Sequence, residues 1–169
     1  DLFPRPEGTE AFGARCAVLA RTNGERYGQA QALLRRAVEM AHARGIQVAL
    51  GFEFGIHPPE LASIVPPDSW IRGAQLPDPT HPSSIEILRS TIDDILRAYP
   101  GMDWIWLWLH EHTMYVGAAV KAQMGSRFEE IFRRDATFFR DAGSEDSAFT
   151  GVWSLAYVRL ASEYLAARA

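Results

Sequence analysis

The chain has 169 residues, of which 47% are hydrophobic and 22% charged, and a domain of this size buries roughly 68–70% of its unfolded surface, enough for one core. A net charge of -4 without any basic block argues against nucleic-acid binding, and the longest apolar run, Trp104 to Leu109, is far too short to span a bilayer. We therefore expect a soluble protein without a signal peptide or membrane partner, whose ligand is neutral or weakly charged.

A helix followed by a buried strand is predicted near the start of the chain. Apolar residues recur at helical spacing between Tyr27 and Arg44, and Gly45 ends this helix. Residues 46–54 are rich in β-branched and aromatic side chains, as in a strand that is covered on both faces of a parallel sheet. A further short strand is expected at residues 15–20.

The order of helix and strand recurs after a long loop. Residues 55–82 contain seven prolines and predict a loop long enough to bind a ligand. Ser83, followed three residues later by a glutamate, is typical of a capping box, so the second helix is expected from there to Tyr99. Residues 103–111 form the second predicted strand. Its three alternating tryptophans are assigned to the hydrophobic core: Trp104, Trp106 and Trp108.

Two more helices are predicted toward the C-terminus, one opened by a capping box of Ser126 and Glu129 and one from about Val152 to Ala167. Alternating helices and buried strands are typical of a parallel α/β sheet with right-handed crossovers. A complete eight-stranded barrel takes about 250 residues. We therefore predict an α/β fold in which residues 1–169 form a single domain, part of a (β/α)8 TIM barrel whose remainder comes from the same chain.

Both predicted strands end in a glutamate, Glu53 and Glu111. Ligands of parallel α/β folds lie beyond the carboxyl ends of the strands, and neighbouring strands are ~4.8 Å apart. Two carboxylates placed there fall within the ~5–9 Å used in glycoside hydrolysis, and their repulsion raises the pKa of one of them, as a general acid requires. Alternatively, each glutamate pairs with an arginine, such as Arg21 or Arg72, or caps the next helix.

Histidines near these strand ends raise a metal alternative. His57, His110 and His112, together with the two glutamates, offer imidazole and carboxylate ligands for a divalent ion. Their spacing matches no recognised metal-binding signature, and consecutive residues that leave a strand diverge. The prediction therefore contains no metal and no cofactor, and assigns the histidines to substrate binding or to solvent.

Aromatic and polar residues of the loops are the other candidates for substrate contacts. An indole ring packs against the apolar face of a pyranose, which makes Trp70 in the long loop a candidate and offers Trp108, near the strand end, as an alternative to its assignment to the core. The turn after the strand expected at residues 15–20 adds polar side chains at the same end of the sheet as the two glutamates. The full set of predicted substrate-binding residues is Arg21, Asn23, His57, Trp70, His110 and His112.

Residues 41–55, AHARGIQVALGFEFG, and residues 77–111, PDPTHPSSIEILRSTIDDILRAYPGMDWIWLWLHE, resemble the middle of a glycoside-hydrolase (β/α)8 barrel. The chain is similar in this respect to bacterial sugar-hydrolase-like barrels related to the hexosaminidase and α-glucuronidase groups. The resemblance implies that Glu111 is the general acid or acid/base and that Glu53 is a substrate-binding or assisting carboxylate. It departs from the large glycosidase clans at His110, where those clans have Asn, and the chain lacks the seventh strand that often carries the nucleophile.

The sequence thus predicts a carbohydrate-active hydrolase that cleaves a glycosidic bond of a small sugar or oligosaccharide, with Glu111 donating a proton to the leaving oxygen. One alternative is a metal-dependent sugar isomerase or epimerase that uses Glu53, Glu111, His57 and His112. Another is a non-catalytic barrel domain that binds carbohydrate.

Overall fold

The computed structural model describes residues 21–55, 61, 63–71, 76–109, 117–141 and 144–168. Contacts between Cα atoms divide them into two compact units. The first unit holds the residues up to Leu50 together with Leu96–Ile105, and the second holds Gly51–Ile95 and the residues from Trp106 onward. The predicted strand at residues 15–20 lies outside the described residues, and the single domain stays a prediction.

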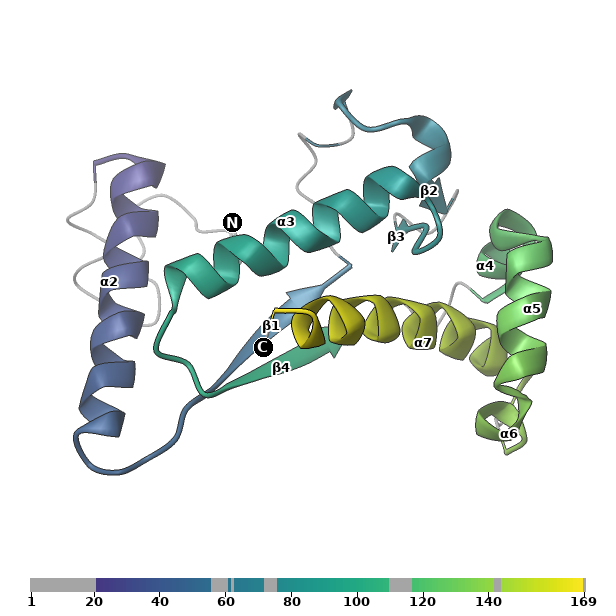
Figure 1. The fold of residues 1–169 in the computed structure, drawn as a ribbon. Helices are drawn as coiled ribbons and strands as arrows, with labels where there is room; N and C mark the ends of the chain where they lie inside the picture. Colours follow the sequence, from purple (N-terminus) through teal and green to yellow (C-terminus); the bar gives the residue numbers. More distant parts are fainter. Residues whose placement is uncertain are drawn as a thin grey trace. The chain divides into compact units, whose positions relative to one another are not determined.

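Helices account for most of the described residues (Figure 1). The elements are α2 (Asn23–His42), β1 (Ala49–Phe54), the short helical turn η3 (Pro67–Ser69), β2 (Trp70–Ile71), β3 (Leu76–Pro77), α3 (Pro82–Ala98), β4 (Trp104–Leu109), α4 (Gly117–Met124), α5 (Ser126–Arg134), α6 (Ala136–Phe139) and α7 (Glu145–Ala166). The two predicted pairs of helix and strand are therefore confirmed as α2 with β1 and α3 with β4.

The predicted partial (β/α)8 barrel is wrong. The described strands form two sheets of two strands each, β1 with β4 and the antiparallel pair β2 with β3. The arrows of β1 and β4 point the same way in Figure 1, as in a parallel pair. Beyond β4, however, every described element is a helix, so the alternation stops after two strands. A barrel needs a closed ring of strands, and the described part of the chain holds none.

The first unit is organised around α2. The Thr22 side chain accepts a hydrogen bond from the Glu25 backbone N–H at 3.1 Å, which caps this helix earlier than predicted. Gly45 takes a positive φ of 71°, and the chain leaves the helix there as expected. The turn after α3 approaches α2 closely, because a Cβ built at Gly101 would lie 3.3 Å from a methyl carbon of Val38.

Asp103 fixes the register between β1 and β4 in the first unit. Its carboxylate accepts the Val48 N–H at 2.7 Å and hydrogen-bonds His42 Nε2 at 2.8 Å. The backbone N–H groups of Asp103 and Trp104 both donate to the Val48 carbonyl, at 3.0 and 3.2 Å. The Val48 hydrogen bond, and after it the one from His42, holds the pKa of the Asp103 carboxyl below its ordinary range.

The second unit contains the larger core, to which helices α3, α4, α5 and α7 contribute. Phe128 of α5 meets Phe149 of α7 edge to face at 5.0 Å between ring centroids. The buried Trp153 side chain donates its indole N–H to the Pro77 carbonyl at 2.8 Å, which ties α7 to the β2–β3 pair. The other large side chains of this core include Ile71, Leu88, Ile92, Val120 and Val152.

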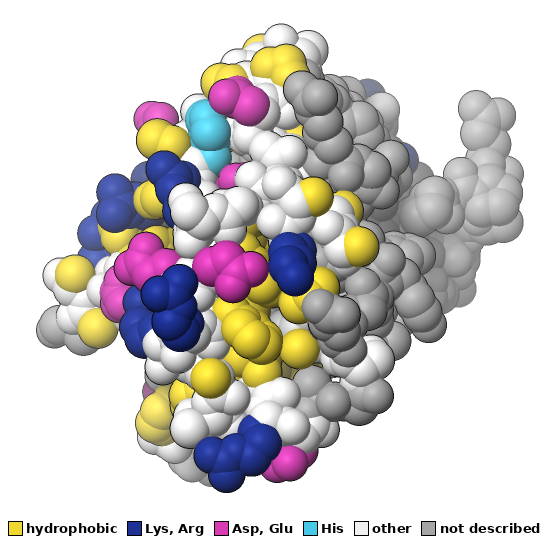
Figure 2. All heavy atoms as spheres, turned by 90° about the vertical axis from the view of Figure 1, so that its right-hand side faces the viewer, with side chains coloured by type: hydrophobic (Ala, Val, Ile, Leu, Met, Phe, Trp, Pro, Cys, Tyr) yellow, Lys and Arg dark blue, Asp and Glu magenta, His cyan; other side chains and the backbone are white. Residues whose placement is uncertain are grey.

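Ion pairs join α7 to its neighbours. Arg159 donates two hydrogen bonds, of 2.7 and 2.8 Å, to the carboxylate of Asp135 at the start of α6. These hydrogen bonds hold the pKa of the Asp135 carboxyl below its ordinary range. Near the end of α7, Arg168 and Tyr164 both bind Asp93 of α3. Figure 2 shows acidic and basic side chains beside one another around hydrophobic ones on the face that it displays.

Two predicted capping boxes do not form. Ser83 lies inside the first turn of α3 because Pro82 takes the first helical position, where its missing N–H costs nothing, and His81 Nδ1 accepts the Ser83 N–H at 3.2 Å instead. Ser126 is likewise the first residue of α5, which follows Gly125 without a side-chain cap. The last helix begins earlier than expected, because Ser144 caps it through the Ser147 N–H at 3.1 Å.

Candidate functional site

The β1–β4 sheet brings a carboxylate and two indole rings to one of its faces. A Cβ built at Gly51 of β1 would lie 3.6 Å from the Trp106 ring of β4. Side chains alternate along a strand, so Glu53 shares the face of Gly51, and Trp108 shares the face of Trp106. We call this set the tryptophan face: Gly51, Glu53, Trp106 and Trp108. All of its members belong to the second unit.

The indole rings of the tryptophan face are exposed. Trp106 and Trp108 keep 59% and 45% of their surface in solvent, and their ring centroids are 5.2 Å apart at an interplanar angle of 42°. Glu53 is exposed as well. The sheet thus presents two adjoining flat apolar surfaces beside a carboxylate.

The assignment of the β4 tryptophans to the core is therefore wrong. Trp104, in the first unit, is also exposed, and its indole N–H donates to the Gln47 side chain at 3.4 Å. The side chains that alternate with these residues are the covered ones. They are buried or half-buried: Leu50, Phe52, Ile105 and Leu107. These residues form the covered face of the sheet, and its tryptophans lie on the other face.

The predicted pair of carboxylates is described only at Glu53. Glu111 lies outside the described residues, and so do His57, His110, His112 and the possible arginine partner Arg72. The pairing of the two glutamates and the roles of the three histidines stay predictions. Within the described ranges, no group of three His, Cys, Asp or Glu side chains could hold a metal ion.

The remaining predicted site residues are not on the tryptophan face. Arg21 and Asn23 belong to the first unit, where the Arg21 backbone N–H donates to Glu25 at 2.7 Å and Asn23 is the first residue of α2. Trp70 belongs to the separate β2–β3 pair, opposite Pro77, and is half-buried there. Of the described residues in the predicted substrate-binding set, none belongs to the tryptophan face.

Sequence reasoning considered Trp108 as a surface for a sugar but preferred the core for all three tryptophans of β4, although the sequence contains a signal for the exposed indole pair. The β1 face that carries Glu53 also carries Ala49 and Gly51. Side chains this small cannot cover the large indole rings of the neighbouring strand. The combination of a small, polar face on one strand with tryptophans on the next indicates an aromatic surface that stays open.

None of the helices in the described ranges is long and apolar enough to cross a membrane. No protein-family model, no curated protein and no solved structure matches the chain.

Proposed function

We propose that the protein binds a saccharide on the tryptophan face. The observation that carries this proposal is the exposed pair of neighbouring indole rings at Trp106 and Trp108, with Glu53 on the same face. Indole rings pack against the C–H face of a pyranose, and a carboxylate accepts hydrogen bonds from sugar hydroxyls. This combination fits a neutral sugar, as the overall charge of the chain also suggests.

The exposed area is large enough to matter for binding. A Trp side chain offers roughly 150–250 Å², so a sugar that covers about 100 Å² of each ring gains ~2.5 kcal/mol per ring at ~25 cal/mol per Å². Association itself costs several kcal/mol, which the two rings and the hydrogen bonds must exceed. We therefore expect dissociation constants in the millimolar to micromolar range.

Affinity electrophoresis tests this proposal. The protein is run through native gels that contain a soluble polysaccharide, such as xylan, mixed-linkage β-glucan or glucomannan. Trp106→Ala and Trp108→Ala should each reduce the retardation about tenfold or more, since each removes one stacking surface. Phe138→Ala is the matched control, because Phe138 is 73% exposed on α6 and is not part of the tryptophan face. Equal retardation of all three variants, or none with any polysaccharide, would refute the proposal.

Hydrolysis of the bound saccharide is a second candidate function. It is favoured by the exposed position of Glu53 on the same face as the indole rings. We propose that Glu111, two residues beyond the last residue of β4, donates the proton to the leaving oxygen and that Glu53 is the second carboxylate.

Release of reducing ends from the polysaccharide that is bound tests this second function. Glu111→Gln and Glu53→Gln should each lower the rate ~10²–10⁴-fold, because each removes one partner of the acid/base pair. Retardation in the gel should change less than threefold in Glu111→Gln. Binding without any release of reducing ends would leave the saccharide-binding proposal standing and end the hydrolase proposal.

A further inference from the structure

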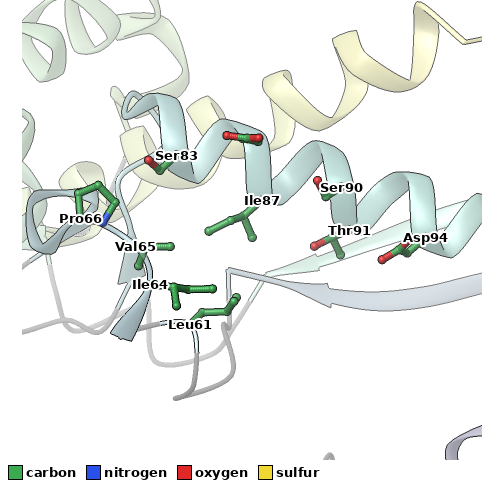
Figure 3. A pocket seen from close by; sticks show the side chains of 10 residues that line it. Leu61, Ile64, Val65, Pro66, Ser83, Ile87, Ser90, Thr91 and Asp94 are labelled. Carbon is green, nitrogen blue, oxygen red and sulfur yellow. The ribbon is translucent and has the colours of Figure 1, made fainter.

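A groove of about 450 Å³ runs along α3 in the second unit (Figure 3). One side is the α3 helix, and the other is formed by Leu61, Ile64, Val65 and Pro66. The backbone N–H groups of Ile64 and Val65 both donate to the Leu61 carbonyl at 3.0 Å, which holds these three residues in a turn. We call this the α3 groove; its lining residues are Leu61, Ile64, Val65, Pro66, Ser83, Glu86, Ile87, Ser90, Thr91 and Asp94.

The residues of α3 that line the groove lie on a different side of the helix from those buried in the core. The buried residues of α3 are Ser84, Leu88, Ile92 and Ile95, and the lining residues fall between them at helical spacing. Figure 3 shows Leu61, Ile64 and Val65 opposite Ser83 and Ile87, with Thr91 and Asp94 farther along the helix. The groove thus has an aliphatic end and a polar continuation on the same surface.

The chemistry of the lining is amphipathic and negative. Two of the lining residues are acidic, Glu86 and Asp94, and none is basic. Glu86 is exposed and has no ion-pair partner among the described residues. Opposite α3, Ile64 keeps 75% of its surface in solvent, an unusual exposure for an aliphatic side chain on an ordered turn.

We propose that the α3 groove binds an extended peptide segment of a partner protein in which aliphatic residues alternate with Lys or Arg. Aliphatic side chains of the segment cover Ile64 and Ile87, while its cations face Glu86 and Asp94. A negative lining on a chain of net charge -4 attracts cations and disfavours anionic partners.

The dimensions of the groove favour a peptide over a small molecule. Ser83 and Asp94 are eleven residues apart on one helix, or ~16 Å at ~1.5 Å per residue. This matches about five residues of extended chain at ~3.3 Å each. A small molecule needs a concave site that buries most of its surface, whereas the exposed Ile64 and Glu86 leave this groove open along its length.

Fluorescence anisotropy with labelled hexapeptides tests the proposal on the full chain. The probe alternates Leu and Lys; one comparison peptide alternates Leu and Glu, and another alternates Ser and Lys. Only the Leu–Lys peptide should bind, and its affinity should fall as salt is raised, because screening weakens contacts between exposed charges. Equal binding of the Ser–Lys peptide would mean non-specific charge attraction, and no binding of the Leu–Lys peptide would mean no peptide site; either result overturns the proposal.

Variants of the lining localise the binding. Ile64→Ser should weaken the Leu–Lys peptide about tenfold, because it removes half of the aliphatic contact. Glu86→Gln should weaken it about threefold, whereas Glu130→Gln, which removes an exposed carboxylate from α5, should change it less than twofold. An unchanged affinity in Ile64→Ser overturns the proposal. So does concentration-dependent dimerisation that Ile64→Ser abolishes, since the occupant is then a second copy of the chain.

The saccharide proposal and the peptide proposal fail independently. No lining residue of the α3 groove belongs to the tryptophan face, and the groove contains no aromatic side chain. Trp106→Ala should therefore leave the affinity for the Leu–Lys peptide unchanged. A loss of peptide binding in that variant would place the peptide elsewhere and overturn the groove assignment.

Discussion

Gly55 lies where the backbone packs directly against the core residue Trp153 and leaves no room for a side chain. It follows β1 with a positive φ of 87°, and a Cβ placed on it would lie 2.7 Å from the ring of Trp153. Trp153 is fully buried and hydrogen-bonded to Pro77, so its ring has no free space into which to move. Glycine meets both requirements at once, since it adopts this backbone conformation without strain and brings no Cβ.

We predict that Gly55→Ala lowers the free energy of unfolding by about 2–4 kcal/mol. Roughly 1–2 kcal/mol comes from a left-handed conformation in a residue with a Cβ, and the rest from overpacking against Trp153. Gly28→Ala is the matched control: Gly28 lies within α2, nothing would meet its Cβ within 4 Å, and alanine should raise stability by ~0.5–1 kcal/mol. Urea denaturation measures both, and equal stability of Gly55→Ala and the wild type would contradict the account of this contact.

Asp103 gives the stability of the first unit a dependence on pH. The pKa of its carboxyl is held below its ordinary value of 3.8 by the Val48 N–H and by His42. A depressed folded-state pKa means that the carboxylate stabilises the fold above the unfolded pKa, and that this contribution is lost as the pH falls through the folded pKa.

We predict that Asp103→Asn destabilises the protein at pH 7 and that its difference from the wild type shrinks as the pH falls below the ordinary value of 3.8 and through the lower folded-state pKa, where the carboxyl is protonated in the folded wild type too. Urea denaturation between pH 2.5 and 7 measures the difference. Glu39→Gln, which removes an exposed carboxylate from α2, should follow the wild-type curve at every pH. A difference between Asp103→Asn and the wild type that stays constant down to pH 2.5 would show that ionisation of Asp103 contributes nothing.

At the scale of elements, the sequence predicts the first two helix–strand pairs well and the ends of helices poorly. The spacing of Ala30, Leu33, Leu34 and Ala37 identifies α2 because a helix places such residues on one side. Helix ends depend on single contacts instead. Pro82 takes the first helical position of α3, so Ser83 falls inside the first turn and donates its backbone N–H to His81 Nδ1. The short α4 carries no strong amphipathic pattern, and so it was not predicted.

The C-terminal end of α7 is held by its contact with α3. Arg168 makes hydrogen bonds of 2.7 and 2.8 Å to the two oxygens of Asp93 and lies 3.9 Å from the centre of the Tyr164 ring. Tyr164 donates to the same carboxylate at 2.9 Å. The hydrogen bonds to Asp93 and the stacking of Arg168 on the Tyr164 ring therefore hold the last turn of α7 in place. The C-cap of this helix is Ala167, whose side chain cannot form a hydrogen bond.

We predict that Arg168→Ala loosens the last turn of α7 without unfolding the molecule. Backbone amides of residues 163–166 should exchange with solvent several-fold faster, because the turn opens locally when its anchor is removed. Amides around Val152 and Trp153, in the buried middle of α7, should not change. Arg140→Ala, which removes an exposed arginine just after α6, is the control. Faster exchange throughout α7 would contradict the local role assigned to Arg168.

At the scale of the whole molecule, the sequence does not show which face of a strand is covered by other parts of the protein. Apolar content shows that β4 belongs to a sheet, but both of its faces are apolar, and apolar content alone does not decide which one is covered. Leu107 lies on the covered face and Trp106 on the open one, although their neighbourhoods in the sequence are nearly identical. The barrel was inferred from the same ambiguity, since a strand that is apolar on both faces is typical of a fully covered parallel sheet.

The open tryptophan face has a consequence for association. Large exposed apolar patches of folded proteins bind partners or drive association, and strand edges that lack a neighbour add backbone groups that can pair with another chain. We predict that the protein associates reversibly at high concentration and that the double substitution Trp106→Ser with Trp108→Ser suppresses this association. Serine replaces each indole ring with a small polar side chain and so removes the apolar surface. Because both positions are exposed, the fold should tolerate the double substitution.

Sedimentation velocity between about 5 and 200 µM measures this association. Phe138→Ser is the control, because it removes another exposed aromatic ring outside the tryptophan face and should leave association as in the wild type. A saccharide that retards the protein in the gel assay should also suppress association of the wild type, because the sugar and a second chain compete for the same indole rings. A wild-type protein that stays monomeric over the whole range would show that two exposed indoles are too small a surface for self-association. Association that persists in the double variant would place the contact on another face.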